Sequence, residues 1–155
     1  MLKIINANRP GEIELARTLF REYESWLGFD LCFQGFEQEL RELPGKYSPP
    51  EGRLLLALAD EKIAGCIAMR KLDKDICEMK RLFVRDGFRG QKIGAALIAQ
   101  IIDEARAAGY SKMRLDTYPA IMKKAVSLYE THGFRAIAPY YEDPQDGLLF
   151  MELEL

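Results

Sequence analysis

The stretch "LFVRDGFRGQKIGAALI", Leu82 to Ile98, most constrains what this chain can fold into. It opens with β-branched and aromatic residues typical of a strand, passes through three glycines and three cationic side chains, and ends with the apolar periodicity of a helix. A strand that turns through a glycine-rich, basic loop into a helix is a recurrent anion site, because free backbone N–H groups and the positive end of the helix dipole converge there. The stretch therefore predicts a ligand that carries phosphate.

The glycine spacing excludes the two best-known phosphate loops. Gly87, Gly90 and Gly94 give G-x-x-G-x-x-x-G, which is neither the G-x-G-x-x-G of dinucleotide folds nor the P-loop pattern. A dinucleotide fold also places its glycines after the first strand, whereas two helices and four strands are expected before these. The glycines alone are compatible with a tight turn in which Gly94 allows close packing. The three cations of the same loop favour phosphate binding over such a turn.

The remaining elements predict an α+β fold in one domain, residues 1–155. A chain of 155 residues with 48% hydrophobic content fits one domain with a substantial core, and no repeat or linker-like segment divides it. The mixture of strands and helices favours a sheet with helices on its faces, in the order β-α-α-β-β-β-α-β-α-β-β. Apolar spacing and turn residues predict strands at 2–6, 53–59, 62–70, 76–84, 112–117, 134–137 and 147–155, and helices near 13–27, 36–43, 93–105 and 121–132.

The apolar pattern of the strand at 76–84 changes phase near its middle. Cys77 and Met79 share one face of a regular strand, whereas the later apolar residues Leu82 and Val84 have the opposite parity. A β-bulge explains the slip, because it adds one residue to the strand, and bulges are frequent beside active sites. A strand covered on both faces, with an irregular pattern, explains it equally well.

Composition and charge limit the partners. A formal net charge of -2 argues against a broad nucleic-acid-binding surface, and the longest apolar run, 54–59, is far shorter than the ~20 residues of a membrane-spanning helix. Three widely spaced cysteines and a single histidine, His132, predict no metal site. Nothing near the N-terminus resembles a signal peptide, so we expect a reduced, cytoplasmic protein. The cysteines Cys66 and Cys77 fall in predicted strands and are expected in the core.

Two motifs resemble those of the GNAT superfamily of N-acetyltransferases. "RGQKIG", Arg89 to Gly94, is similar to the superfamily's acetyl-CoA loop, Arg/Gln-x-x-Gly-x-Gly/Ala, and "AVSLYETHGF", Ala125 to Phe134, is similar to its A-x-x-L-Y-x-x-x-G-F segment. The resemblance implies a mixed, mostly antiparallel twisted sheet flanked by helices on both faces. It also implies direct transfer of an acetyl group from acetyl-CoA, the cosubstrate, to a primary amine whose identity the sequence leaves open.

The chain departs from the family pattern at two positions. Lys92 stands where many members carry a glycine of the loop. Its backbone amide must therefore contact the ligand although this residue, unlike glycine, has a side chain. Met122 stands where many members carry an asparagine that contacts the pantetheine arm. Both departures bear on the affinity for CoA.

The resemblance assigns the cofactor-binding residues to two segments. The pantetheine arm is expected along Leu82, Phe83 and Val84, in a gap between this strand and "MRLDT". Backbone N–H groups near Phe83 and Val84 could polarise the thioester carbonyl. The pyrophosphate is expected on the amides of Arg89, Gly90, Gln91, Lys92, Ile93, Gly94 and Ala95.

The resemblance also names two catalytic candidates. An amine must lose a proton before it attacks, and Glu78, on the strand that leads to the loop, is the candidate base, directly or through water. A solvated strand carboxylate is the alternative interpretation. Tyr129 is the candidate acid for the departing thiolate, and a core tyrosine with a satisfied hydroxyl is its alternative.

The acceptor pocket is expected between the end of the first helix and the segment before the last strand. The helix is expected to contribute Tyr23, Trp26 and Phe29. The later segment carries aromatic and acidic residues that suit a cationic amine and could form the rim of the pocket. The alternative interpretation is an exposed loop whose acidic residues face solvent. A non-catalytic acyl-CoA-binding sensor and a nucleotide-binding regulator are the competing functions, and a homodimer is one possible assembly. The rim residues are Tyr140, Tyr141, Glu142, Asp143 and Asp146.

Overall fold

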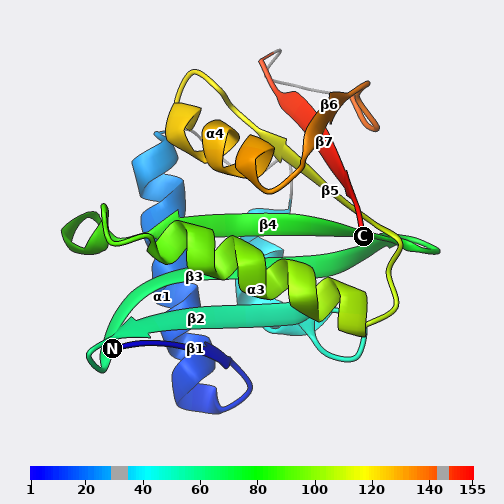
Figure 1. Cartoon of the computed structure of the whole chain (residues 1–155). Coiled ribbons are helices and arrows are strands. Elements are labelled where there is room, and N and C mark those ends of the chain that lie inside the picture. The colour runs from blue at the N-terminus through cyan, green and yellow to red at the C-terminus, as the bar shows by residue number, and fades with distance from the viewer. Residues whose placement is uncertain (29–34, 143–146) are drawn as a thin grey trace.

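Within residues 1–28, 35–142 and 147–155, which the structure describes, seven strands form one sheet in the order β1-β2-β3-β4-β5-β7-β6. The structure is a computed structural model of the chain (Figure 1). All neighbouring strands pair antiparallel except β4 with β5, which are parallel. The strands are β1 (Leu2–Asn6), β2 (Arg53–Ala59), β3 (Lys62–Asp73), β4 (Ile76–Val84), β5 (Lys112–Thr117), β6 (Arg135–Ile137) and β7 (Leu149–Glu154).

Helices cover both faces of the sheet, as Figure 1 shows for α1 behind it and α3 in front. The predicted fold class and element order are confirmed. Helix α4 begins two residues later than predicted, because the amides of Ile121 and Met122 bond back to the Tyr118 carbonyl and form a turn. The helices are α1 (Pro10–Leu27), α2 (Phe36–Glu42), α3 (Ile93–Ala107) and α4 (Lys123–Thr131), with short 3-10 turns η2 (Gly45–Tyr47) and η3 (Asp86–Phe88).

The alternation of side chains along the strands divides the core between the two faces of the sheet. On the face of α3 and α4, Met79 and Leu82 of β4 pack with Leu97, Ile101 and Met113. Burial of this apolar surface is the main force that holds the helices on the sheet. The core on the α1 and α2 face includes Leu19, Phe20, Phe36, Leu40, Tyr47, Leu54, Leu56, Cys66 and Phe83.

A β-bulge at Arg81 confirms the phase slip in the sequence of β4. Cys66 of β3 pairs with Phe83 and Ala68 pairs with Lys80, so two residues of β4 oppose one residue of β3. Arg81 adopts a left-handed backbone with φ of 64°, which is strained for a residue with a side chain. The buried Cys66 thiol donates a hydrogen bond to the Arg81 carbonyl at 3.3 Å and helps to hold the bulge.

The parallel pairing of β4 with β5 ends after three residue pairs, of which the last joins Glu78 to Arg114. Beyond this point β4 continues to Val84 and β5 to Thr117. The bulge lies in the part of β4 that has left β5, so the two strands diverge where the backbone of β4 bends. The divergence opens a gap in the middle of the sheet.

An ion pair buried under α2 fixes the side chain of the bulge residue. The Arg81 guanidinium donates two hydrogen bonds, each of 2.9 Å, to the two carboxylate oxygens of Glu39, and each side chain is 3% exposed. Lys46 lies 3.1 Å from the same carboxylate. Burial opposes ionisation of Glu39, but the hydrogen bonds and charge of Arg81, with those of Lys46, lower its pKa to about 2.

We expect Glu39→Gln to lower the free energy of unfolding by about 3 kcal/mol, because it leaves the buried Arg81 charge without its anion. The matched control is Glu37→Gln on the same helix. Glu37 also holds an arginine through two hydrogen bonds, of 3.2 Å each to Arg21, but its side chain is 52% exposed. Glu37→Gln should lower the free energy of unfolding, measured with urea, by less than about 1 kcal/mol.

The same pair predicts a pH dependence. Because the pKa of Glu39 falls from 4.5 to about 2 on folding, its contribution is present above pH 4.5 and is lost as the pH falls toward 2. The free energies of unfolding of the parent protein and of Glu39→Gln should therefore converge as the pH falls over that range. Equal effects of the two glutamine substitutions at pH 7 would show that the buried pair does not stabilise the bulge.

Candidate active site

A long groove of about 600 Å³ lies where β4 ends, between the loop at 85–92 and the start of α4. The end of β4 contributes apolar side chains, and the first residues of α3 and α4 line the groove on either side. The groove is therefore mostly apolar, with a helix N-terminus at one end. Its lining residues are Trp26, Leu82, Phe83, Val84, Phe88, Arg89, Gly90, Ile93, Gly94, Ile121, Met122, Lys123, Lys124, Ala125 and Leu128.

The loop before α3 directs backbone amides toward this groove. Gly90 and Lys92 have left-handed backbones, with φ of 84° and 63°. The first backbone bond of α3 runs from the Ala96 amide to the Lys92 carbonyl, so the three preceding amides of the helix have no acceptor inside it. The left-handed Lys92 explains why a glycine suits this position in the family pattern.

Most of the residues that the sequence assigned to cofactor binding lie together at the groove. Leu82, Phe83, Val84, Arg89, Gly90, Ile93 and Gly94 line it. Gln91, Lys92 and Ala95 belong to the same loop and helical turn, where an anion would be met by their amides. The contacts of all ten residues with a ligand stay a prediction.

The two arginines of the loop are held by protein groups. Arg89 donates a 2.9 Å hydrogen bond to the Val84 carbonyl and lies over the rings of Trp26 and Phe83, at 5.0 and 5.9 Å from their centroids. Arg85 forms a 2.7 Å ion pair with Glu22 of α1. Trp26 thus lines the groove and not the inner pocket described next, and its part in an acceptor pocket stays a prediction.

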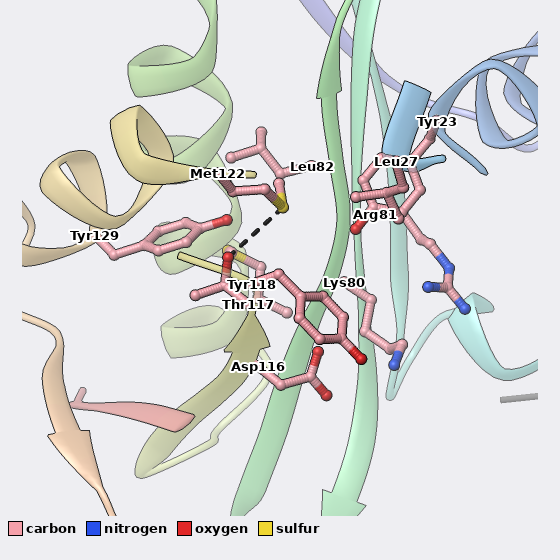
Figure 2. Close-up of a pocket in the computed structure, with 11 residues that line it drawn as sticks. Tyr23, Leu27, Lys80, Arg81, Leu82, Asp116, Thr117, Tyr118, Met122 and Tyr129 are labelled. Carbon is pink, nitrogen blue, oxygen red and sulfur yellow. Dashed lines mark hydrogen bonds between the residues drawn. The ribbon is translucent and has the colours of Figure 1, made fainter. Parts of the chain in front are cut away.

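A second cavity, the inner pocket, occupies the gap between β4 and β5 (Figure 2). Its volume is about 30 Å³. Leu82 and Met122 line both cavities, so the groove and the inner pocket meet at these two side chains. The other lining residues are Tyr23, Leu27, Met79, Lys80, Arg81, Asp116, Thr117, Tyr118 and Tyr129.

The predicted acid, Tyr129, lines the inner pocket. Figure 2 shows its ring extending from α4 toward Met122 and Leu82. The side chain is buried against Phe134, with the ring centroids 5.8 Å apart. Burial raises the pKa of its hydroxyl well above the ordinary value, so the group keeps its proton at neutral pH and can act as a donor.

The predicted base, Glu78, is buried on the opposite face of the sheet. Its carboxylate accepts a 3.0 Å hydrogen bond from Arg70 and a 2.7 Å hydrogen bond from the Tyr140 hydroxyl, and Lys80 lies 3.7 Å away. Burial opposes ionisation, but the charges of Lys80 and Arg70 lower the pKa of Glu78 overall. Glu78 is therefore ionised at neutral pH and is not a solvated strand carboxylate.

Two tyrosines ahead of β7 cover this charged region. Tyr140 donates to Glu78, and Tyr141 donates to Asp116 of β5. Burial, together with the charge of the carboxylate and the hydrogen bond to it, raises the pKa of each tyrosine well above its usual range. Phe29, Asp143 and Asp146, which we also expected near the acceptor, lie outside the described residues.

Sequence reasoning missed Lys80 and Asp116, which both line the inner pocket. The signal was present, because Glu78, Lys80 and Asp116 alternate with apolar residues in β4 and β5 and so face the same side of the sheet. Their neighbourhood depends on the β4–β5 register, which pairs Glu78 with Arg114.

No helix in the described part of the chain is both long and apolar enough to cross a membrane. No group of three or more histidine, cysteine, aspartate or glutamate side chains in the same part is placed to hold a metal ion.

Comparisons with known proteins agree with this geometry. Residues 14–134 match the model of the acetyltransferase (GNAT) family. An uncharacterized N-acetyltransferase of Schizosaccharomyces pombe is 38% identical over 94% of this chain and 90% of its own length. The chain therefore belongs to the GNAT family and is an acyltransferase.

Solved structures show the same fold. A GNAT acetyltransferase from Staphylococcus aureus Mu50 superposes with a TM-score of 0.81 at 23% identity, covering 99% of each chain. PaiA N-acetyltransferase from Thermoplasma acidophilum, determined with coenzyme A, superposes with a TM-score of 0.75 at 20% identity, covering 100% of this chain and 99% of its own.

We expect Lys92→Gly to raise the free energy of unfolding by roughly 0.5 kcal/mol. Removing the side chain relieves about 1–2 kcal/mol of strain in the left-handed backbone at this position. The greater conformational freedom of glycine in the unfolded chain offsets about half of that gain. Gly90→Ala, in the same loop, should instead cost about 1 kcal/mol, because it places a side chain at φ of 84°. Urea unfolding of both variants checks the loop conformation, and a destabilised Lys92→Gly would contradict it.

Proposed function

We propose that the chain transfers an acetyl group from acetyl-CoA directly to a primary amine. The observation that carries the proposal is that the groove at the N-terminus of α3 and the inner pocket in the gap where β4 leaves β5 lie side by side and share the lining side chains Leu82 and Met122. GNAT enzymes use acetyl-CoA and act on amines. Coenzyme A in the PaiA structure adds support, because the fold is shared.

The groove suits the chemistry of coenzyme A. The unbonded amides before Ala96 would hold the pyrophosphate, since a helix N-terminus attracts anions. The pantetheine arm would lie along Leu82, Phe83 and Val84, where β4 has no partner in the described β5 ladder. Met122, at the place of the family's asparagine, offers only a thioether there, and its sulfur lies 3.6 Å from the Thr117 hydroxyl.

The reaction forms a C–N bond and breaks a C–S bond at the thioester carbonyl. The neutral amine supplies the electron pair of the new bond, and the sulfur leaves with the electrons of the old one. The nitrogen gives up a proton, and the sulfur takes a proton. Tyr129, which lines the inner pocket and keeps its hydroxyl proton, would donate to the sulfur.

Glu78 would receive the amine's proton, directly or through ordered water. Because its pKa is lowered, the carboxylate is in the proton-accepting form at neutral pH, but it is a weak base. The hydrogen bond from Tyr140 connects it toward the rim of the acceptor side. The neighbouring Lys80, unlike Glu78, lines the inner pocket.

We expect Gly94→Val to weaken CoA binding by roughly 10- to 100-fold, the equivalent of an overpacking cost of about 1–3 kcal/mol. A Cβ at Gly94 would lie 3.6 Å from Leu128 and 3.9 Å from Val84, across the groove. Gly87→Val is the control, because Gly87 is exposed and does not line the groove. Calorimetric titrations use CoA, ATP and NAD. Unchanged CoA affinity in Gly94→Val, or tighter binding of ATP or NAD, would overturn the assignment of the groove.

We expect Tyr129→Phe to lower kcat by about 100-fold while the affinity for CoA is kept. General acid catalysis contributes about 10²- to 10⁴-fold, and a thiol with a pKa near 8.5 leaves fairly well without help. Phenylalanine retains the ring packing against Phe134. Steady-state release of free thiol with a panel of amines measures the change, beside calorimetry with CoA. Full turnover would show that the hydroxyl is structural, and a parallel loss of affinity would make Tyr129 a binding residue.

A further inference from the structure

The acceptor side of the sheet is densely charged, and most of its charges pair with one another. Residues of alternate positions in β3, β4, β5 and β7 share this face. Arg70 pairs with Glu78 at 3.0 Å, and Arg114 pairs with Glu152 at 2.8 Å. Arg81 is held by Glu39 through both carboxylate oxygens. These close pairs neutralise the groups that take part in them.

Lys80 and Asp116 are matched less closely. The ion pair that the structure gives Lys80 is the 3.7 Å contact with Glu78, whose carboxylate is already held by Arg70 and Tyr140. Asp116 accepts a hydrogen bond from Tyr141, a neutral group. In the part of the chain that the structure describes, two opposite charges without a close ionic partner therefore line the same small cavity.

The negative charges around Lys80 do not fully offset its burial. Its side chain is 9% exposed. Burial lowers its pKa, and the charge of Arg81 lowers it further, while Glu78 and Asp116 only partly compensate. A buried ammonium in this position is stabilised by an additional anion. Figure 2 shows the ends of Lys80, Tyr118 and Asp116 directed to the same region beside the gap.

We infer that the acceptor is a small amine that also carries a carboxylate, an α-amino acid in the simplest case, bound between Asp116 and Lys80. The inference rests on the proposed acetyl transfer and names the substrate class of that site. Asp116 would attract the ammonium group, and Lys80 would hold the carboxylate. Because Lys80 and Asp116 line the same small cavity, the two charges of the acceptor must lie close together, as they do when both groups are attached to one carbon.

The test compares L-amino acids that have a primary amine with their α-amides, which keep the amine and lose the negative charge. Thiol release from acetyl-CoA is measured for each pair. A charged hydrogen bond contributes about 1.5–3 kcal/mol, so the best acid should exceed its amide in kcat/KM by roughly 10- to 100-fold. Lys80→Met should remove this preference by slowing the acid alone. Lys71→Met is the control, since Lys71 is 47% exposed and pairs with Glu51.

The outcomes separate this inference from the proposed function. If amides react as fast as acids, or if Lys80→Met slows both alike, the acceptor carries no carboxylate at this site although acetyl transfer stands. If no amine releases thiol, acetyl transfer fails, and calorimetry on the CoA-saturated protein decides the inference. Acid binding that exceeds amide binding and depends on Lys80 supports it, and equal or absent binding of both overturns it. Unchanged melting temperature and CoA affinity show that Lys80→Met folds.

Discussion

The early end of the β4–β5 ladder is the constraint on which the rest of the site depends. Three parallel pairs join the strands, and then the left-handed Arg81 bends β4 away. Strain of this kind persists only where the surroundings over-determine it. Here Glu39 of α2 accepts two hydrogen bonds from the Arg81 side chain, and the Cys66 thiol of β3 donates one to the Arg81 carbonyl. A helix and a neighbouring strand therefore both stabilise the bulge. The gap is thus a stable feature of the fold.

The bulge also decides which side chains meet at the gap. In a regular strand Leu82 would share a face with Glu78 and Lys80. The extra residue turns Leu82 to the apolar side of α3 and leaves the charged pair on the side of α1 and α2. One irregularity therefore separates an apolar groove from a charged pocket, the proposed sites of the acyl donor and of the acceptor, and Leu82 lines both.

The local features of this arrangement could be predicted from the sequence, whereas the long-range ones could not. The phase change beside Lys80 is visible in the apolar pattern, and the glycine-rich loop indicates a helix N-terminus that binds an anion. Periodicity, however, does not reveal the partner of a side chain. The pairing of Arg85 with Glu22, and the approach of Tyr140 to Glu78, join residues 63 and 62 positions apart. The contact of Trp26 with Arg89 could not be predicted for the same reason, because the neighbour of a helix end depends on how the helix crosses the sheet.

The buried charges on the face of the sheet toward α1 and α2 favour ligand binding over a purely structural role. A core of apolar residues would be at least as stable as one with buried ion pairs, so such pairs are weak evidence for a purely structural role. On this sheet the closely paired groups, Arg70 with Glu78 and Arg114 with Glu152, surround two that are less well matched. Lys80 and Asp116 are those two, and both face the gap where the thioester would lie. Polar groups preorganised in this way lose little free energy to rearrangement when a complementary dipolar ligand arrives, and so their incomplete pairing favours binding.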